Sequence, residues 1–251
     1  MPISPASRVL YERFWTTVEK SADIGKGREN GLSRLALTDA DKEMRDIFVS
    51  WCGEAGLRVT VDQVGNIFGR RNGLDNSLPP VLIGSHLDTQ ENGGRFDGIV
   101  GVLGALEMVK TLNDLGHVTR RPIEIVNWTN EEAARFSPPM TASCCFAGAY
   151  AVDWVHGRPG DDGTTFGDEL RRIGYQGEAT PGNRPVDAYF ELHIEQGPIL
   201  DAEKVEVGIV THAYSSHGFL VEFKGETAHT GRGRWKGDAT RSSPPRACSW
   251  R

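Results

Sequence analysis

Residues 80–88 read PVLIGSHLD, a short apolar run that passes directly into an imidazole and a carboxylate. A continuous apolar run of this length is typical of a strand that is buried on both faces of a sheet. His86 and Asp88 follow at the end of that strand. In open α/β sheets, ligands bind beyond the carboxyl ends of the strands. We therefore expect a functional site at this edge of the predicted sheet.

Two more apolar runs end in the same way. Residues 122–128 lead into Asn130-Glu131-Glu132, and residues 188–194 carry His193 with Glu195 following. Strands are also expected at 57–61, with a hairpin partner at 66–69, and at 204–211 and 219–223. Apolar residues at helical spacing predict helices over 10–18, 39–55, 98–115 and 165–173. The alternation of strands and helices predicts an α/β fold, a mixed sheet with helices on both faces.

Composition narrows the class of protein. The chain has 251 residues, with 28 Lys+Arg against 34 Asp+Glu and a net charge of -6. This acidic balance argues against nucleic acid as a partner, which usually requires a basic face. No apolar run approaches the length of a membrane span, and the N-terminus lacks a secretion signal. Cys52, Cys144, Cys145 and Cys248 lack metal-type spacing, so we expect a reduced, cytoplasmic protein.

The first polar cluster contains His86, Asp88 and Asp97. Imidazole and carboxylate are preferred ligands for Zn²⁺, Mn²⁺ or Co²⁺. In an extended segment His86 and Asp88 point the same way, so we expect the Asp88 carboxylate to accept the second ring N–H of His86. Asp97 lies among glycines, where the backbone can bend to leave room for a pair of metal ions, and a carboxylate can bridge two ions.

The other two clusters supply carboxylates and a further imidazole. Glu131 and Glu132 are adjacent, so their side chains diverge, and one can bind metal while the other handles a proton. A period of two would place Glu191, His193 and Glu195 on one face of a strand. Taken singly, each cluster is more often a structural hydrogen bond or a solvated helix start. Together, at three strand ends, they indicate a metal-dependent hydrolase.

Four motifs carry a family resemblance: GSHLDTQ at 84–90, GRFDGI at 94–99, NEEAARF at 130–136 and FELHIEQGP at 190–198. In this order they resemble the M20-type dinuclear metal amidohydrolases. The nearest branch contains the N-carbamoyl-amino-acid hydrolases, the β-ureidopropionases and the allantoate amidohydrolases. The resemblance runs from about residue 10 to about residue 231. It implies a zinc-peptidase-like catalytic domain, followed by a smaller α+β lid that also forms a dimer.

The resemblance also implies a set of metal ligands. One divalent ion would be bound by His86, His193 and the bridging Asp97. The other would be bound by Asp97, Glu132 and one further histidine. Zn²⁺, Mn²⁺ and Co²⁺ all suit such ligands, so the metal stays open.

Catalytic and substrate roles follow from the same resemblance. Glu131 would activate the attacking water and then protonate the leaving nitrogen, and Asp88 would orient His86. Gln196 would lie near the substrate. His229 matches a histidine on the lid that stabilises the tetrahedral intermediate. The implied reaction is hydrolysis of the ureido C–N bond of a small N-carbamoyl amino acid, giving the amino acid, CO₂ and ammonia.

The last twenty residues, Arg232 to Arg251, show neither a helical nor a strand period. With G/C-rich codons, a one-base shift of the reading frame near codon 232 would make Trp235-Lys236 overlap Met-Glu and could encode an amphipathic helix that matches the family's continuation. The alternative is a naturally short variant with a divergent tail. We therefore expect residues 1–211 to be an incomplete catalytic domain, 212–231 to begin the lid, and 232–251 to be an aberrant tail. A chain lacking the last ligand and most of the lid is expected to turn over little substrate, and its dimerisation is doubtful.

Three alternatives stay open. The substrate could be N-carbamoyl-β-alanine, an N-carbamoyl-L-amino acid or allantoate. An M20 dipeptidase or aminoacylase is a second possibility, although those enzymes usually carry an acidic residue at the position of His193. The third is a metal-binding remnant without catalysis. Metal content and ammonia release separate the enzyme from the remnant.

Overall fold

The computed structural model describes residues 9–213 of the chain. The chain divides into two compact units, residues 1–196 and residues 197–251. In the second unit the described residues form one short helix, α7 (Ile199–Glu203). Among the described residues, no helix is both long enough and apolar enough to cross a membrane.

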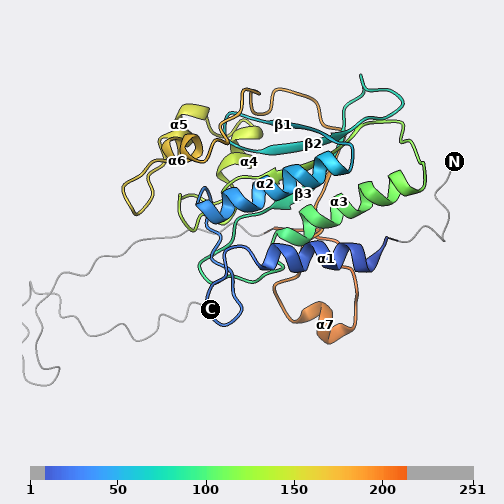
Figure 1. Ribbon diagram of the computed structural model, residues 1–251, viewed down its shortest axis with the longest axis horizontal. Coiled ribbons are helices and arrows are strands. Elements are labelled where there is room, and N and C mark those ends of the chain that lie inside the picture. The colour runs from blue at the N-terminus through green and yellow to red at the C-terminus, as the bar shows by residue number, and fades with distance from the viewer. Residues whose placement is uncertain (1–8, 214–251) are drawn as a thin grey trace, which may run out of the picture. The chain divides into compact units, whose positions relative to one another are not determined.

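The first unit is built on a five-stranded mixed sheet (Figure 1). Its strands are ordered β1-β2-β4-β3-β5. Strand β3 lies between β4 and β5 and pairs in parallel with both, whereas β2 runs antiparallel to both β1 and β4. The bounds are β1 (Arg58–Val61), β2 (Ile67–Arg71), β3 (Val81–His86), β4 (Ile123–Trp128) and β5 (Ala188–Phe190).

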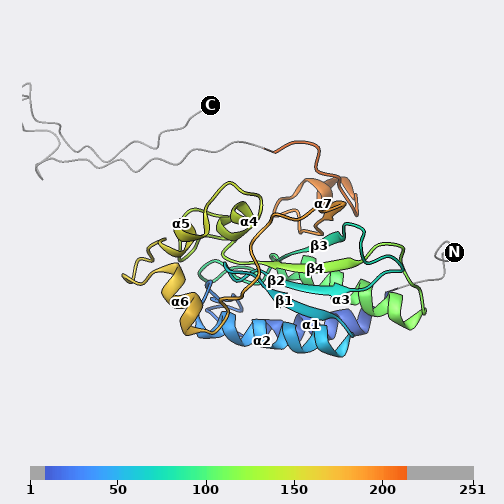
Figure 2. The ribbon, with the colours of Figure 1, turned by 90° about the horizontal axis from the view of Figure 1, so that it is seen from above.

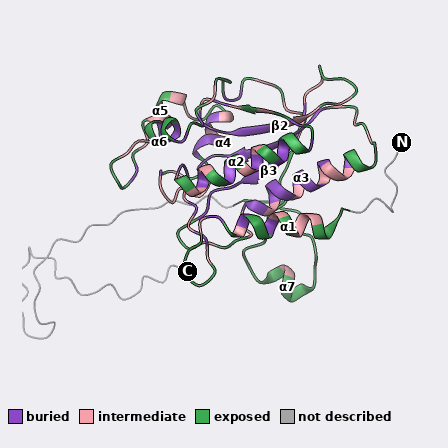
Figure 3. Ribbon diagram, viewed as in Figure 1, coloured by how far each residue is buried: buried purple, intermediate pink, exposed green. Residues whose placement is uncertain are grey.

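Three long helices, α1 (Tyr11–Ala22), α2 (Asp39–Glu54) and α3 (Ile99–Asp114), lie along one face of this sheet (Figure 2). Figure 3 shows buried residues along α2, α3 and the strands, and the main hydrophobic core contains residues of both the helices and the sheet. On the other face, Phe146 of α4 (Thr141–Phe146) packs against the rings of Phe68 and Trp128. The chain continues through α5 (Val152–His156) and α6 (Phe166–Arg172). The predicted mixed sheet with helices on both faces is confirmed.

Most helices and strands that were predicted from residues within the same segment are confirmed. Helix α2 begins after Thr38, whose side chain accepts the N–H of Asp41, as expected of an N-cap. The predicted strands at 57–61 and 122–128 and the helices at 98–115 and 165–173 match observed elements to within a few residues. The helix expected at 10–18 is longer than predicted, because α1 continues to Ala22.

Two strand predictions are wrong. Strand β5 ends at Phe190 and not at residue 194, because its pairing with β3 stops at the Ile83–Phe190 pair. Residues 204–211 form no strand, since no described residue pairs with them. Alternating Val and Ile side chains favour a strand only where a neighbour supplies the hydrogen bonds. The strand expected at 219–223, the lid start beyond residue 213 and the tail lie outside the described residues.

A buried ion pair ties α2 to the edge of the sheet that carries the site. Arg45 donates from Nε to Asp41 at 2.8 Å, and both side chains are almost fully excluded from solvent. Arg45 also donates to the carbonyl of Gly65 and to the hydroxyl of Thr129, which follows β4 directly. The pair therefore connects the helical layer to the turn that carries the two adjacent glutamates.

We expect Arg45→Ala to lower the free energy of unfolding by about 3–5 kcal/mol, because it leaves the Asp41 carboxylate buried without its partner. Urea denaturation followed by circular dichroism measures the change. Lys42→Ala is the matched control on the same helix, since Lys42 pairs with Asp46 in a largely exposed position and such pairs contribute little. Equal losses for both variants would contradict this reading of the buried pair.

Candidate metal centre

Three strand ends bring the predicted site residues together. Strands β3, β4 and β5 are parallel, so their carboxyl ends lie at one edge of the sheet. His86 is the last residue of β3, Glu131 follows β4 within a short turn, and His193 follows β5. This placement agrees with the rule that sites in such sheets form beyond the strand ends.

His86, Asp97 and His193 form a candidate metal-binding group. Each offers one ligand atom, and these atoms all lie within 4.8 Å of one another. The Asp97 carboxylate lies between the rings, with Oδ1 3.9 Å from His86 Nε2 and 3.2 Å from His193 Nε2. Two imidazoles and one carboxylate are a donor set that suits Zn²⁺, Mn²⁺ or Co²⁺. The residues present therefore fit a divalent transition-metal ion.

A main-chain carbonyl orients the ring of His86. Its Nδ1 lies 2.9 Å from the carbonyl oxygen of Asp88 and donates to it, which leaves Nε2 directed toward Asp97. The prediction of a hydrogen bond from His86 to the Asp88 carboxylate is wrong, because that carboxylate lies 3.8 Å from Nδ1, beyond hydrogen-bond distance. Its two oxygens instead accept the main-chain N–H groups of Glu131 and Glu132. Asp88 thus orients His86 through its backbone and the glutamate turn through its side chain.

The glycine after Asp97 is required by the packing of His86. A Cβ atom at Gly98 would lie 2.5 Å from three atoms of the His86 ring, and Gly98 also has a φ of +65°. Any other residue would therefore displace the imidazole and strain the backbone.

We expect Gly98→Ala to weaken metal binding by about 10- to 100-fold, comparable to the loss of a residue that orients a ligand. Calorimetric titration with Zn²⁺ measures the effect. Gly94→Ala tests the same loop at a position with open space, and Gly163→Ala tests a left-handed glycine with open space elsewhere. Unchanged metal affinity in Gly98→Ala would show that the His86 ring is not held by this contact.

Glu131 lies half-buried beside the metal-binding group, in surroundings that raise its pKa. Its Oε2 lies 3.5 Å from His86 Nε2, which is the ring nitrogen directed toward Asp97. Burial raises the pKa of Glu131, and although His86 opposes this, the carboxylates of Asp88 and Glu132 raise it further. A carboxylate with a raised pKa is a stronger base near neutral pH.

The neighbouring charges also act on His86 and Asp88. Burial lowers the pKa of His86, but the carboxylates of Asp88 and Glu131 outweigh it and leave the pKa above its ordinary value. Burial raises the pKa of Asp88, against the opposing effects of His86 and of the two main-chain N–H groups. The site therefore concentrates negative charge that a cation would neutralise.

The remaining predicted site residues that the structure describes are not part of the three-residue group. The Glu132 carboxylate accepts the side-chain amide of Gln90 at 2.7 Å and is not part of the three-residue group. Gln196 donates its amide to Asp97 Oδ2 at 2.5 Å, so it borders the three-residue group. His229 lies outside the described residues.

Two residues that bond the Glu191 carboxylate are not among the predicted site residues. Ser85 donates to Glu191, and the hydroxyl of Tyr189 bonds the same carboxylate. The period of two that grouped Glu191 with His193 also includes Tyr189, and that signal could have found it. Ser85 is adjacent to His86 but is fully buried, and sequence alone does not separate it from a core residue.

Comparison with known proteins identifies the family. The model of the peptidase family M20/M25/M40 matches residues 82–248. The chain belongs to this family. The match includes the residues of the candidate metal centre, and the predicted M20 resemblance is confirmed.

The M20 relatives include several with named activities. An N-carbamoyl-L-amino-acid amidohydrolase of Rhizobium meliloti is 50% identical over 224 residues, which make up 89% of this chain and 54% of the relative. A ureidoglycolate hydrolase of Arabidopsis thaliana is 36% identical over 223 residues, or 85% of this chain and 47% of the relative. The chain spans about half the length of the curated relatives it matches.

Solved structures agree with the M20 assignment. A hydantoinase/carbamoylase family amidase from Burkholderia multivorans matches with a TM-score of 0.79 at 52% identity, over 80% of this chain and 49% of that chain. A similar amidase from Burkholderia ambifaria matches with a TM-score of 0.77 at 52% identity, over 78% and 48% of the two chains. The fold of the first unit is therefore that of a carbamoylase-type M20 protein.

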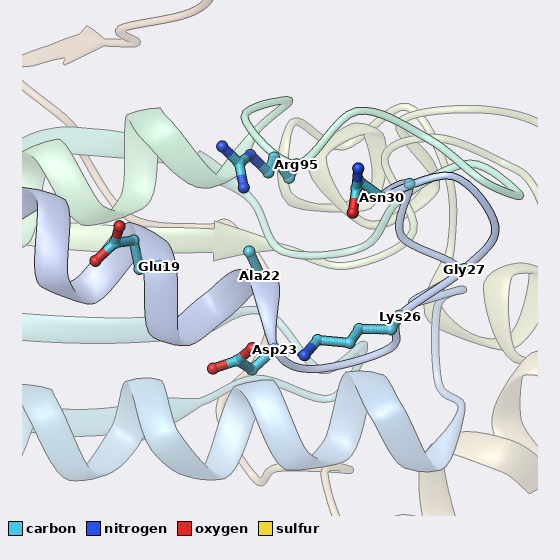
Figure 4. A pocket seen from close by; sticks show the side chains of 8 residues that line it. Glu19, Ala22, Asp23, Lys26, Gly27, Asn30 and Arg95 are labelled. Carbon is cyan, nitrogen blue, oxygen red and sulfur yellow. Dashed lines mark ion pairs between the residues drawn. The ribbon is translucent and has the colours of Figure 1, made fainter.

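A separate pocket lies beside the C-terminal end of α1 (Figure 4). It has a volume of about 330 Å³ and is lined by side chains of both charges, among them Glu19, Asp23, Lys26 and Arg95. Lys26 is already paired with Asp23 at 2.8 Å. No metal-centre residue lines this pocket, so it is distinct from the candidate metal centre.

Proposed function

We propose that the full-length form of this protein hydrolyses the ureido C–N bond of N-carbamoyl-L-amino acids. The observation that carries the proposal is the His86–Asp97–His193 group with Glu131 beside it. The relative from Rhizobium meliloti, which carries this activity in its name, supports the choice of substrate. A metal-binding group next to a half-buried carboxylate suits hydrolysis of an unreactive carbonyl by metal-assisted general-base catalysis.

Each residue has a defined task in the proposed reaction. Bound divalent ions would polarise the ureido carbonyl and lower the pKa of the attacking water. Glu131 accepts a proton as the water oxygen adds to the ureido carbon. The same proton then passes from Glu131 to the leaving nitrogen as the C–N bond breaks. Asp88 holds the His86 ring and the turn that carries Glu131 and Glu132 in place through the three hydrogen bonds described above.

The proposal also includes the number of metal ions, their ligands and the residues that contact the substrate. Two ions would be bound, the first by His86, Asp97 and His193 and the second by Asp97, Glu132 and one further histidine. Gln196 would contact the substrate, and His229 would stabilise the tetrahedral intermediate. A homodimer formed through the lid and a cytoplasmic location are part of the same proposal. The free cysteines among the described residues accord with a reducing compartment.

One second candidate has a specific observation in its favour. The relative from Arabidopsis thaliana is named a ureidoglycolate hydrolase, and its substrate also carries a ureido group next to a carboxylate. The higher identity of the carbamoyl-amino-acid relative favours the first candidate.

A substrate panel tests the proposal. A full-length form is incubated with N-carbamoyl-L-amino acids, N-carbamoyl-β-alanine, allantoate, ureidoglycolate and a dipeptide, and the released ammonia and amino acid are measured. The proposal predicts that N-carbamoyl-L-amino acids have the highest kcat/KM. Preference for ureidoglycolate would favour the second candidate, and cleavage of the dipeptide alone would overturn both.

A further inference from the structure

The position of His193 is not explained by the sheet. Pairing between β3 and β5 ends with Ile83 and Phe190, three residues before the ligand. His193 is substantially exposed, and its own Nδ1 bonds the carbonyl of the next residue, Ile194. The bond from Gln196 to Asp97 holds the far end of the segment that carries His193, and another contact is needed to hold the start of that segment, next to β5.

Side-chain bonds of Glu191 extend beyond the point where the strand pairing ends. Its Oε1 accepts the hydroxyl of Ser85 at 2.5 Å, and its Oε2 lies 2.5 Å from the hydroxyl of Tyr189. That hydroxyl in turn accepts the indole N–H of Trp128 at 3.0 Å. Glu191 is thus connected to the penultimate residue of β3 and, through Tyr189, to the last residue of β4.

Ser85, which donates to Glu191, and Trp128, which donates to Tyr189, are themselves fixed. Ser85 is fully buried and lies directly before His86, and Trp128 is the last residue of β4 and is nearly buried. The segment after Glu191 also runs close to α3, since a Cβ atom at Gly101 would lie 2.7 Å from the carbonyl oxygen of Leu192. A rigid edge of the sheet therefore holds one side of this segment, and the start of α3 limits its other side.

We propose that Glu191 is a positioning residue that holds His193 at the metal centre by joining the segment after β5 to the ends of β3 and β4. Glu191 is not in the metal-binding group, and each of its carboxylate oxygens has a hydroxyl partner. Its effect on the metal passes through His193. The inference rests on the proposed function only in taking His193 as a metal ligand.

Cobalt binding by the 251-residue chain tests the inference. Co²⁺ is titrated into the wild-type protein and into Glu191→Ala, and affinity and visible absorption are recorded. Glu191→Ala is expected to bind Co²⁺ about 10- to 100-fold more weakly, the usual cost of removing a group that orients a ligand. Glu178→Ala, at an exposed position remote in sequence from the site, is expected to bind as the wild type does.

Removal of His193 separates positioning from general damage to the fold. If Glu191 acts through His193, then Glu191→Ala costs nothing more in a His193→Ala background. Tyr189→Phe and Ser85→Ala each remove one bond to Glu191 and should weaken Co²⁺ binding by an intermediate amount. These two variants also decide the matter if Glu191→Ala does not fold.

The outcomes separate failure of the positioning role of Glu191 from failure of the proposed metal centre. Absence of Co²⁺ binding by the wild type would overturn both. Binding by the wild type with the same affinity in Glu191→Ala would overturn the positioning role alone. An undiminished effect of Glu191→Ala in the His193→Ala background would also overturn it.

Discussion

Glu131→Gln is expected to reduce hydrolysis of an N-carbamoyl-L-amino acid by about 10²- to 10⁴-fold in a full-length form, the range that general acid–base groups contribute. The amide has nearly the same shape but cannot accept the proton of the attacking water. Glu131 is not in the group His86, Asp97 and His193, so metal binding should be retained. Ammonia release and metal content are measured on the same preparation.

The control for this variant is Glu43→Gln, which changes an exposed glutamate on α2. It should leave the rate unchanged. If Glu131→Gln kept most of the activity, Glu131 would not be the base. If it lost the metal together with the activity, Glu131 would be a ligand instead.

Asp97→Ala is expected to cause the largest loss of metal. Asp97 is the only carboxylate in the three-residue group, and its Oδ1 lies within 4 Å of both ring nitrogens. Its removal leaves two neutral imidazoles and takes away the negative charge that favours a cation. Affinity for Zn²⁺ should fall by more than the ~100-fold that loss of an orienting group costs at most.

Calorimetric titration with Zn²⁺ measures this loss, with Asp161→Ala as the matched control. Asp161 is an exposed aspartate in the loop before α6, and its removal should leave the affinity unchanged. Retention of full affinity by Asp97→Ala would place the metal elsewhere and contradict the proposed ligand set.

The parts of the fold that the sequence predicts well depend on local signals. The apolar run before His86 and the run at 122–128 predict buried strands because short, continuous apolar runs of this length are typical of strands buried on both faces. Thr38 predicts the start of α2 because its cap is made within the same turn. Since parallel strands end at one edge, the meeting of His86 and Glu131 also follows from the order of the elements, whereas His193 lies three residues beyond the last β3–β5 pair.

Other features depend on contacts between residues far apart in the sequence. The segment 204–211 alternates like a strand, but pairing partners are not encoded in the segment itself. An extended chain beyond residue 86 would place the Asp88 carboxylate beside the His86 ring. The strand ends at His86, and the chain turns so that the carbonyl of Asp88 reaches the ring instead. The close approach of Gly98 to His86 likewise appears only in the folded chain.

The most direct test of the proposed function measures metal content and ammonia release together in a full-length form supplied with an N-carbamoyl-L-amino acid. We predict two divalent ions per chain and release of ammonia with the free amino acid. One weakly bound ion and no release of ammonia would contradict the proposal and identify a metal-binding protein without this catalysis.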